Sequence, residues 1–225
     1  MQRSTRKEAD MNTYKILQSA GGVSTEPAPA LMHQYTHNFP APGIPAFPRQ
    51  NASGSAAASD TLPLHPLSLR TLLQKVNKAD TAPVILCIGT DRIIGDSLGP
   101  LVGTLLQRCG AHDLPVYGTL ENTVHALNLH DILPQIKKAH PGRTVVAIDA
   151  SLGPAAEVGS VFIRPGSLHP GAGVSKRLPA AGDLSITGIA GTEGRQPYLS
   201  LQTARLSTIM EMAERIRDCI LSLQQ

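Results

Sequence analysis

The amino-acid sequence predicts an α/β fold of three layers, α/β/α, in which helices cover both faces of a mostly parallel sheet. Short, continuous apolar runs, typical of strands buried on both faces, alternate along the chain with segments of helical apolar spacing. Such an alternation usually connects parallel strands of one sheet. Of the 225 residues, 41% are hydrophobic but only 3% are aromatic, so the core must be aliphatic.

The first expected helix and strand follow residue 60. Ser68 is a suitable N-cap for a helix over 69–80, in which three leucines and a valine recur at helical spacing. The run PVILCIGT at 83–90 is short and almost wholly apolar, which favours a strand with both faces buried.

A loop and a helix over 95–110 are expected next. Asp96 or Ser97 is the candidate N-cap, because short polar side chains accept hydrogen bonds from the free amides of a first helical turn. Pro100 suits the first turn, and Gly110 is a typical residue at which a helix ends.

The rest of the chain continues the alternation. A helix is expected over 123–138, where Pro134 would kink or shorten it. A long amphipathic helix is expected over 196–223. The remaining expected strands lie at 114–120, 143–150, 159–166 and 183–191.

Residues 1–60 are expected to form a disordered tail rich in Pro, Ala and Ser, ahead of a single α/β domain at 61–225. The tail has no helical or strand period, so it cannot bury enough apolar surface to offset the entropy lost on ordering. His33 and His37 are four residues apart within it. The neighbouring prolines argue against the helix that would bring these two side chains together as metal ligands.

Composition excludes several classes of partner. The net charge is +3 with no run of Lys or Arg, which argues against nucleic-acid binding. No stretch approaches the ~18 apolar residues of a membrane span, and the first residues lack the apolar segment of a secretory signal. Cys87, Cys109 and Cys219 are far apart, so we expect buried free thiols and a cytoplasmic protein.

Two acidic residues lie where a parallel sheet usually places its active site. Asp96 is in the loop after the first long strand, and Asp149 is at the end of the strand VVAIDA. A carboxylate at such a place loses hydration, and this costs free energy unless the group is paired or serves a function. The sequence therefore predicts a shared site, against the alternatives of an N-cap role for Asp96 and a turn or cap role for Asp149.

Other kinds of site fit the sequence less well. The segment GTDRIIGDS lacks the phosphate-loop pattern GxxxxGK[ST], and no GxGxxG follows the first strand. Residues 95–98 spell the GDSL word of a serine esterase family, but no histidine after His169 could act as the base for Ser97. The other histidines show no ligand spacing, and neither a metal nor a cofactor is expected.

Five segments between Pro83 and Ile216 occur in the order and spacing of a known family. Together they resemble the spore protease (YyaC-type) sporulation proteins of endospore-forming bacteria. The segments are LCIGTDRIIGDSLGPLVGTLL, VYGTLENTVHALNL, VVAIDASLG, VGSVFIRPGSLHPGAGVSKRLPAAGDLSITGIAG and LQTARLSTIMEMAERI.

This family is similar to the germination protease that degrades small acid-soluble spore proteins, and more distantly to hydrogenase-maturation endopeptidases. The resemblance implies a phosphorylase/hydrolase-like fold. It also implies a sporulation-associated endopeptidase in the cytoplasm of the forespore or mother cell. The expected partner is a protein or peptide substrate, and a homo-oligomer is left open.

The resemblance also assigns the site. The catalytic aspartates of the germination protease fall in D-[AS]-L-G-P and I-D-A-L segments, which correspond here to Asp96 in DSLGP and Asp149 in IDASL. Hydrogenase-maturation enzymes place metal-binding acids at both positions and add a histidine in an S-x-H segment. The nearest counterpart here, Ser185-Ile186-Thr187-Gly188, has no histidine, which favours paired-aspartate chemistry over metal recognition.

Two interpretations stay open beside this one. The stretch 165–182 is rich in Gly and Pro, and with Lys176, Arg177 and Asp183 it is a candidate substrate-binding loop or else a plain surface connection. The chain as a whole could also be a non-catalytic sporulation factor that keeps the protease fold and binds a protein partner.

Overall fold

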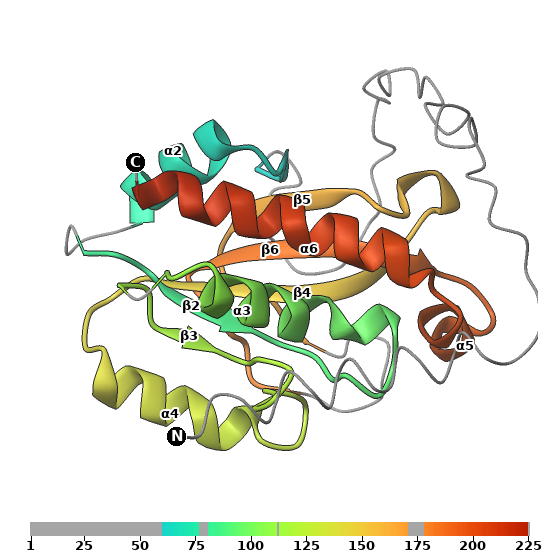
Figure 1. Ribbon diagram of the computed structural model, residues 1–225, viewed down its shortest axis with the longest axis horizontal. Coiled ribbons are helices and arrows are strands. Elements are labelled where there is room, and N and C mark those ends of the chain that lie inside the picture. Colours follow the sequence, from blue (N-terminus) through green and yellow to red (C-terminus); the bar gives the residue numbers. More distant parts are fainter. Residues whose placement is uncertain (1–59, 77–80, 112, 171–177, 225) are drawn as a thin grey trace, which may run out of the picture. The chain divides into compact units, whose positions relative to one another are not determined.

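The computed structural model describes residues 60–76, 81–111, 113–170 and 178–224, all within the compact unit Ala52–Gln225. In this part of the chain six strands form one sheet in the order β1-β5-β6-β4-β2-β3 (Figure 1). The strands are β1 (Leu62–Pro63), β2 (Val84–Cys87), β3 (Val116–Tyr117), β4 (Val145–Gly153), β5 (Val161–Pro165) and β6 (Leu184–Thr192).

The sheet is mostly parallel, as the sequence predicts. Strands β3, β2, β4 and β6 run parallel, whereas β5 pairs antiparallel with β6 and β1 pairs antiparallel with β5. The antiparallel direction of β5 follows from its short connection, Pro154–Ser160, because a return to the other end of the sheet needs a dozen or more residues. The two-residue β1 was not predicted.

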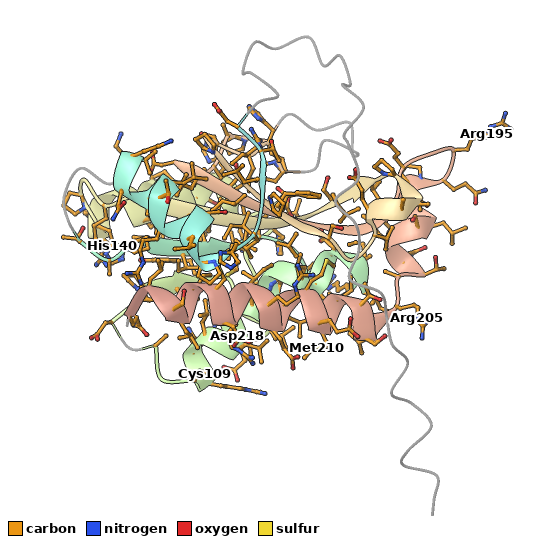
Figure 2. All side chains as sticks on the ribbon, turned by 90° about the horizontal axis from the view of Figure 1, so that it is seen from above. Cys109, His140, Arg195, Arg205, Met210 and Asp218 are labelled. Atoms are coloured by element: carbon orange, nitrogen blue, oxygen red, sulfur yellow. The ribbon has the colours of Figure 1, made fainter. Side chains whose placement is uncertain are left out.

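Helices cover both faces of the sheet, which confirms the three-layer prediction. The larger core cluster joins one face of the sheet to α2, α3 and α6, and a smaller cluster joins the other face to α4. Figure 1 shows α3 and α6 lying over the sheet, roughly along its strands, and Figure 2 shows α6 running along one side of the sheet. These helices are α2 (Pro66–Val76), α3 (Leu98–Arg108), α4 (Leu129–Ala139) and α6 (Leu206–Leu221).

The structure moves two expected helix starts. Ser68 lies inside α2 and not at its N-cap, since the helix begins at Pro66. Helix α4 begins six residues later than expected, because the Asn128 side chain holds the preceding segment in a turn. It accepts a hydrogen bond from the His125 amide (2.8 Å) and donates one to the Thr123 carbonyl (2.9 Å).

The expected helix over 196–223 is divided in two. Helix α5 (Pro197–Gln202) ends where the Thr203 hydroxyl donates to the Leu199 carbonyl, and α6 begins after Arg205, whose backbone is extended. Three short 3-10 turns complete the described elements: η1 (Gly95–Ser97), η2 (Ala155–Glu157) and η3 (Ser222–Gln224).

The cysteine prediction is correct for two of three residues. All three thiols are free, and Cys87 and Cys219 are buried, but Cys109 is exposed at the end of α3 (Figure 2). No helix in the described ranges is both long and apolar enough to cross a membrane. Of the expected tail, all but Asp60 lies outside the described residues.

Candidate functional site

The chain changes direction at β2, and this makes the junction between β2 and β4 a topological switch point. From β2 it passes through α3 on one face to β3, and then through α4 on the other face to β4, on the opposite side of β2. In open α/β sheets, ligands bind outside the carboxyl ends of the strands at such a switch point. Asp96 lies in η1, between β2 and α3, and Asp149 lies in β4.

Asp149 is the first residue of β4 beyond its pairing with β2. The last paired residues are Cys87 and Ile148, after which the Ile88 amide donates to the Ile148 carbonyl at 2.7 Å. The Asp149 side chain is half-buried, and its Oδ1 accepts a hydrogen bond from the Ala150 amide at 2.9 Å. The carboxyl group therefore lies at the switch point, just beyond the last residue of β4 that pairs with β2.

Close backbone packing holds Asp96 over the end of β2. Gly89 has a φ of +141°, and a Cβ there would collide with the Asp96 carbonyl oxygen. The Thr90 amide donates to both the carbonyl oxygen (3.1 Å) and the Oδ2 (3.0 Å) of Asp96. This shared hydrogen bond fixes the position of the Asp96 carboxyl group relative to β2.

Of the two predicted N-cap candidates, Ser97 occupies the N-cap position of α3 and Asp96 does not. Neither Asp96 nor Ser97 makes a side-chain capping bond to the helix that follows. The Ser97 side chain is buried, and its hydroxyl donates to the Ile94 carbonyl at 2.6 Å. A buried, bonded hydroxyl is not available as an esterase nucleophile, and the Asp96 carboxyl has no helix-capping role.

Burial and mutual repulsion favour protonation of the two aspartates. Burial raises the pKa of Asp96 to about 6, partly offset by the hydrogen bond from Thr90. Burial also raises the pKa of Asp149 well above its usual value. The charge of Asp96 raises it further, and the bond from Ala150 opposes both effects. The two carboxyl groups therefore interact, and together they tend to retain one proton.

The third described candidate residue, Asp183, lies at the opposite end of the parallel strands, where β4 and β6 begin. Its carboxylate accepts a hydrogen bond from the Val145 amide at 2.8 Å, and its own amide donates to the Val145 carbonyl at 2.7 Å. Val145 is four residues before Asp149, about 13 Å along the strand. The structure does not bring Asp183 to the aspartate pair, and Asp183 instead joins the first residues of β4 and β6. Lys176 and Arg177 lie outside the described residues.

A pocket beside β3 does not contain the pair. It has a volume of about 340 Å³ and lies along the edge strand β3, between Gln107 of α3 and Ile132 of α4. Its walls include neither Asp96 nor Asp149. Among the residues that the structure describes, no three His, Cys, Asp or Glu side chains are grouped so that they could hold a metal ion.

Comparison with known proteins identifies the family. The model of the family described as "Protein of unknown function (DUF1256)" matches residues 65–219, which include both aspartates. The chain belongs to this family. This DUF1256 chain is also 48% identical over 152 residues to "Uncharacterized protein YyaC" of Bacillus subtilis (strain 168), over 67% of this chain and 74% of that protein. The predicted relationship to YyaC-type proteins is confirmed.

A solved structure is also similar to this DUF1256 chain. It is the nickel–iron hydrogenase maturation protease HycI from Thermococcus kodakarensis KOD1, with a TM-score of 0.47 and 22% sequence identity. The match covers 68% of this chain and 99% of that chain.

Proposed function

We propose that this protein is an endopeptidase in which Asp96 and Asp149 act as one catalytic pair on a protein or peptide substrate. The observation that carries the proposal is the coupling of two carboxyl groups at the switch point of the sheet, both with raised pKa values. The resemblance of the DSLGP and IDASL segments to the germination protease supports the same two residues.

The chemistry uses the one proton that the pair retains. The ionised carboxylate accepts a proton from a water molecule, whose oxygen attacks the carbonyl carbon of the scissile peptide bond. The protonated carboxyl donates its proton to the carbonyl oxygen, which gives a tetrahedral diol. When the C–N bond breaks, one carboxyl of the pair gives its proton to the leaving nitrogen and the other takes a proton from a hydroxyl of the diol. The products are a new carboxyl group and a new amine, and the pair again holds one proton.

The biological setting is part of the proposal. The resemblance to YyaC-type sporulation proteins supports a role in endospore formation, in the cytoplasm of the forespore or mother cell. Proteins of the developing spore are then the substrate class to test first. Neither a metal nor a cofactor is assigned to the reaction, because both members of the pair are oxygen donors and, within the described part of the chain, no third His, Cys, Asp or Glu joins them as a ligand.

Cleavage profiling tests the proposal. A spore-protein extract is incubated with the wild-type chain or with Asp149→Asn, and newly formed amino termini are labelled and identified by mass spectrometry. We expect a defined set of cleavages with the wild type that is absent with the variant and that survives EDTA. Loss of all cleavage on chelation, with recovery on adding zinc, would show that a metal carries the reaction.

The same experiment separates the enzyme from a non-catalytic sporulation factor. A binding protein would leave the same amino termini in the wild-type, Asp149→Asn and enzyme-free samples. That outcome would overturn the peptidase proposal, because the wild-type chain and the Asp149→Asn variant would have been exposed to the same extract.

A further inference from the structure

A threonine on the neighbouring strand lies directly beside Asp149. In the parallel pairing of β4 with β6, Asp149 is in register with Thr187. Adjacent strands are about 4.8 Å apart, so in-register side chains on one face are immediate neighbours. The sequence comparison singles out this segment only for its lack of a histidine, whereas the register gives Thr187 a place in the site.

The core packing shows that both side chains are on the same face of the sheet. Ile148 and its partner Ile186 belong to the larger cluster under α3 and α6. Gly188 faces the same cluster, because a Cβ built on it would collide with the Leu98 side chain of α3. Since side chains alternate along a strand, Asp149 and Thr187 both point to the opposite face.

Thr187 is also open to the site. Within β6 all residues from Leu184 to Gly191 are buried except Thr187, which is half-buried like Asp149. No hydrogen bond to the Thr187 hydroxyl is present among the described residues, whereas the Ser185 hydroxyl on the same face donates to the Gly166 carbonyl at 2.8 Å. A hydroxyl that is partly open and has no internal partner can turn toward its neighbour.

We propose that Thr187 is a positioning residue whose hydroxyl donates a hydrogen bond to the ionised carboxylate of Asp149. This inference rests on the proposed function. The bond places the negative charge of the pair on Asp149 and orients that carboxylate toward the attacking water. The hydroxyl acts through Asp149 and transfers no proton itself.

Three substitutions separate this role from a structural one. Thr187→Val keeps the shape and the strand preference of the side chain but removes the hydroxyl, and with it only the proposed bond to Asp149. Thr187→Ser keeps the hydroxyl. Ser185→Ala is the matched control, because it removes a hydroxyl from the same strand and face that already bonds to Gly166.

The first readout is a carbon-13 NMR titration of the aspartate carboxyl groups in the full chain, which needs no turnover. Apart from burial, Asp96 is the charged group that acts on Asp149 among the described residues. We expect Thr187→Val to raise the apparent pKa of the pair by roughly half a unit to one unit, because a hydrogen bond to the charged form is lost. Thr187→Ser and Ser185→Ala should titrate like the wild type.

The second readout is peptide turnover. Thr187→Val should lower kcat about tenfold and leave KM unchanged, and Thr187→Ser should restore most of kcat. A wild-type titration in Thr187→Val would overturn this inference even if the aspartate variants lose all turnover. A shifted titration in a chain that cleaves nothing would instead support the Thr187–Asp149 bond and overturn the peptidase function on which its catalytic role rests.

Discussion

At the scale of single residues, the site is a pair of carboxyl groups kept where ionisation is unfavourable. Asp96 and Asp149 lose hydration through burial, and the charge of Asp96 also opposes the ionisation of Asp149. One amide hydrogen bond to each carboxyl group, from Thr90 and from Ala150, offsets only part of the rise in pKa. A pair that costs stability in this way is typical of a functional site rather than of a structural ion pair.

The pH dependence of stability follows from these shifts. The folded protein binds protons at the pair more tightly than the unfolded chain, in which an aspartate has a pKa near 3.9. The free energy of unfolding should therefore fall as pH rises from about 4 through about 6. Asp96→Asn should raise the free energy of unfolding at pH 7 by ~1–3 kcal/mol, because the side-chain oxygen can still accept from the Thr90 amide while the charge is removed.

Thermal and urea unfolding between pH 4 and pH 8 measure this effect. In the double variant Asp96→Asn/Asp149→Asn, the free energy of unfolding should no longer fall as pH rises. Asp91→Asn, at an exposed position outside the pair, should keep this fall. A wild type whose stability rises steadily over this range would contradict the inferred protonation of the pair.

The sequence could place the two aspartates but not their contacts. Asp96 and Asp149 follow from the rule that sites gather at the carboxyl ends of strands. Ser97 is the N-cap of α3, but the expected capping bond is absent because such a bond needs an extended backbone, whereas Ser97 is helical, with φ −79° and ψ −3°. Thr90 and Thr187 were missed because their proximity to the pair comes from a turn and from strand register, which no local pattern encodes.

At the scale of elements, the position of Asp96 depends on how closely α3 approaches β2. A Cβ at Gly99, in the first turn of α3, would collide with the carbonyl oxygen of Ile88 at the end of β2. Only a residue without a side chain allows this approach. The start of the helix and the end of β2 are therefore in direct backbone contact.

Gly99→Ala tests this packing. Alanine favours a helix by up to about 1 kcal/mol over glycine, whereas overpacking of a tight contact costs typically about 1–3 kcal/mol. Because the contact here is with rigid backbone, we expect net destabilisation, seen as a lower melting temperature, together with reduced turnover. Gly142→Ala is the control, since no atom lies within 4 Å of its Cβ and only the strain of its φ of +74° remains. A stabilised Gly99→Ala would show that α3 is free to move away.

Helix ends were less predictable than the strands. The apolar runs at 83–90 and 143–150 correspond to β2 and β4 because burial on both faces leaves a strong pattern. The break between α5 and α6 has no proline or glycine to signal it. It follows from the Ser200 hydroxyl, which accepts from the Thr192 amide at 2.7 Å and so attaches α5 to the end of β6.

At the scale of the whole molecule, the alternation of elements predicted the layers but not the order of the strands. The predicted five strands are all present, yet β6 is inserted between β4 and β5, and β5 runs antiparallel. This insertion places Thr187 beside Asp149. Strand order depends on long-range pairing, so the third polar side chain of the site could only be found from the fold.

The division of the chain at residue 60 stays a prediction. If residues 1–60 add no packing to the single peptidase-like domain at 61–225, then their deletion should change the melting temperature by no more than a few degrees. Calorimetry of the full chain and of residues 61–225 measures this. A larger loss in the shorter chain would mean that the first segment packs on the domain.

The most direct test of the central claim compares Asp96→Asn, Asp149→Asn and the double variant for turnover of one verified peptide and for thermal unfolding. Each single change should reduce kcat by about 10²–10⁴-fold, the usual contribution of a general acid or base. The double change should cost little more than either single change, because members of one catalytic unit are not additive. All three should fold with melting temperatures at or above that of the wild type. Wild-type turnover in either single variant, or losses that multiply in the double, would contradict a paired-aspartate peptidase.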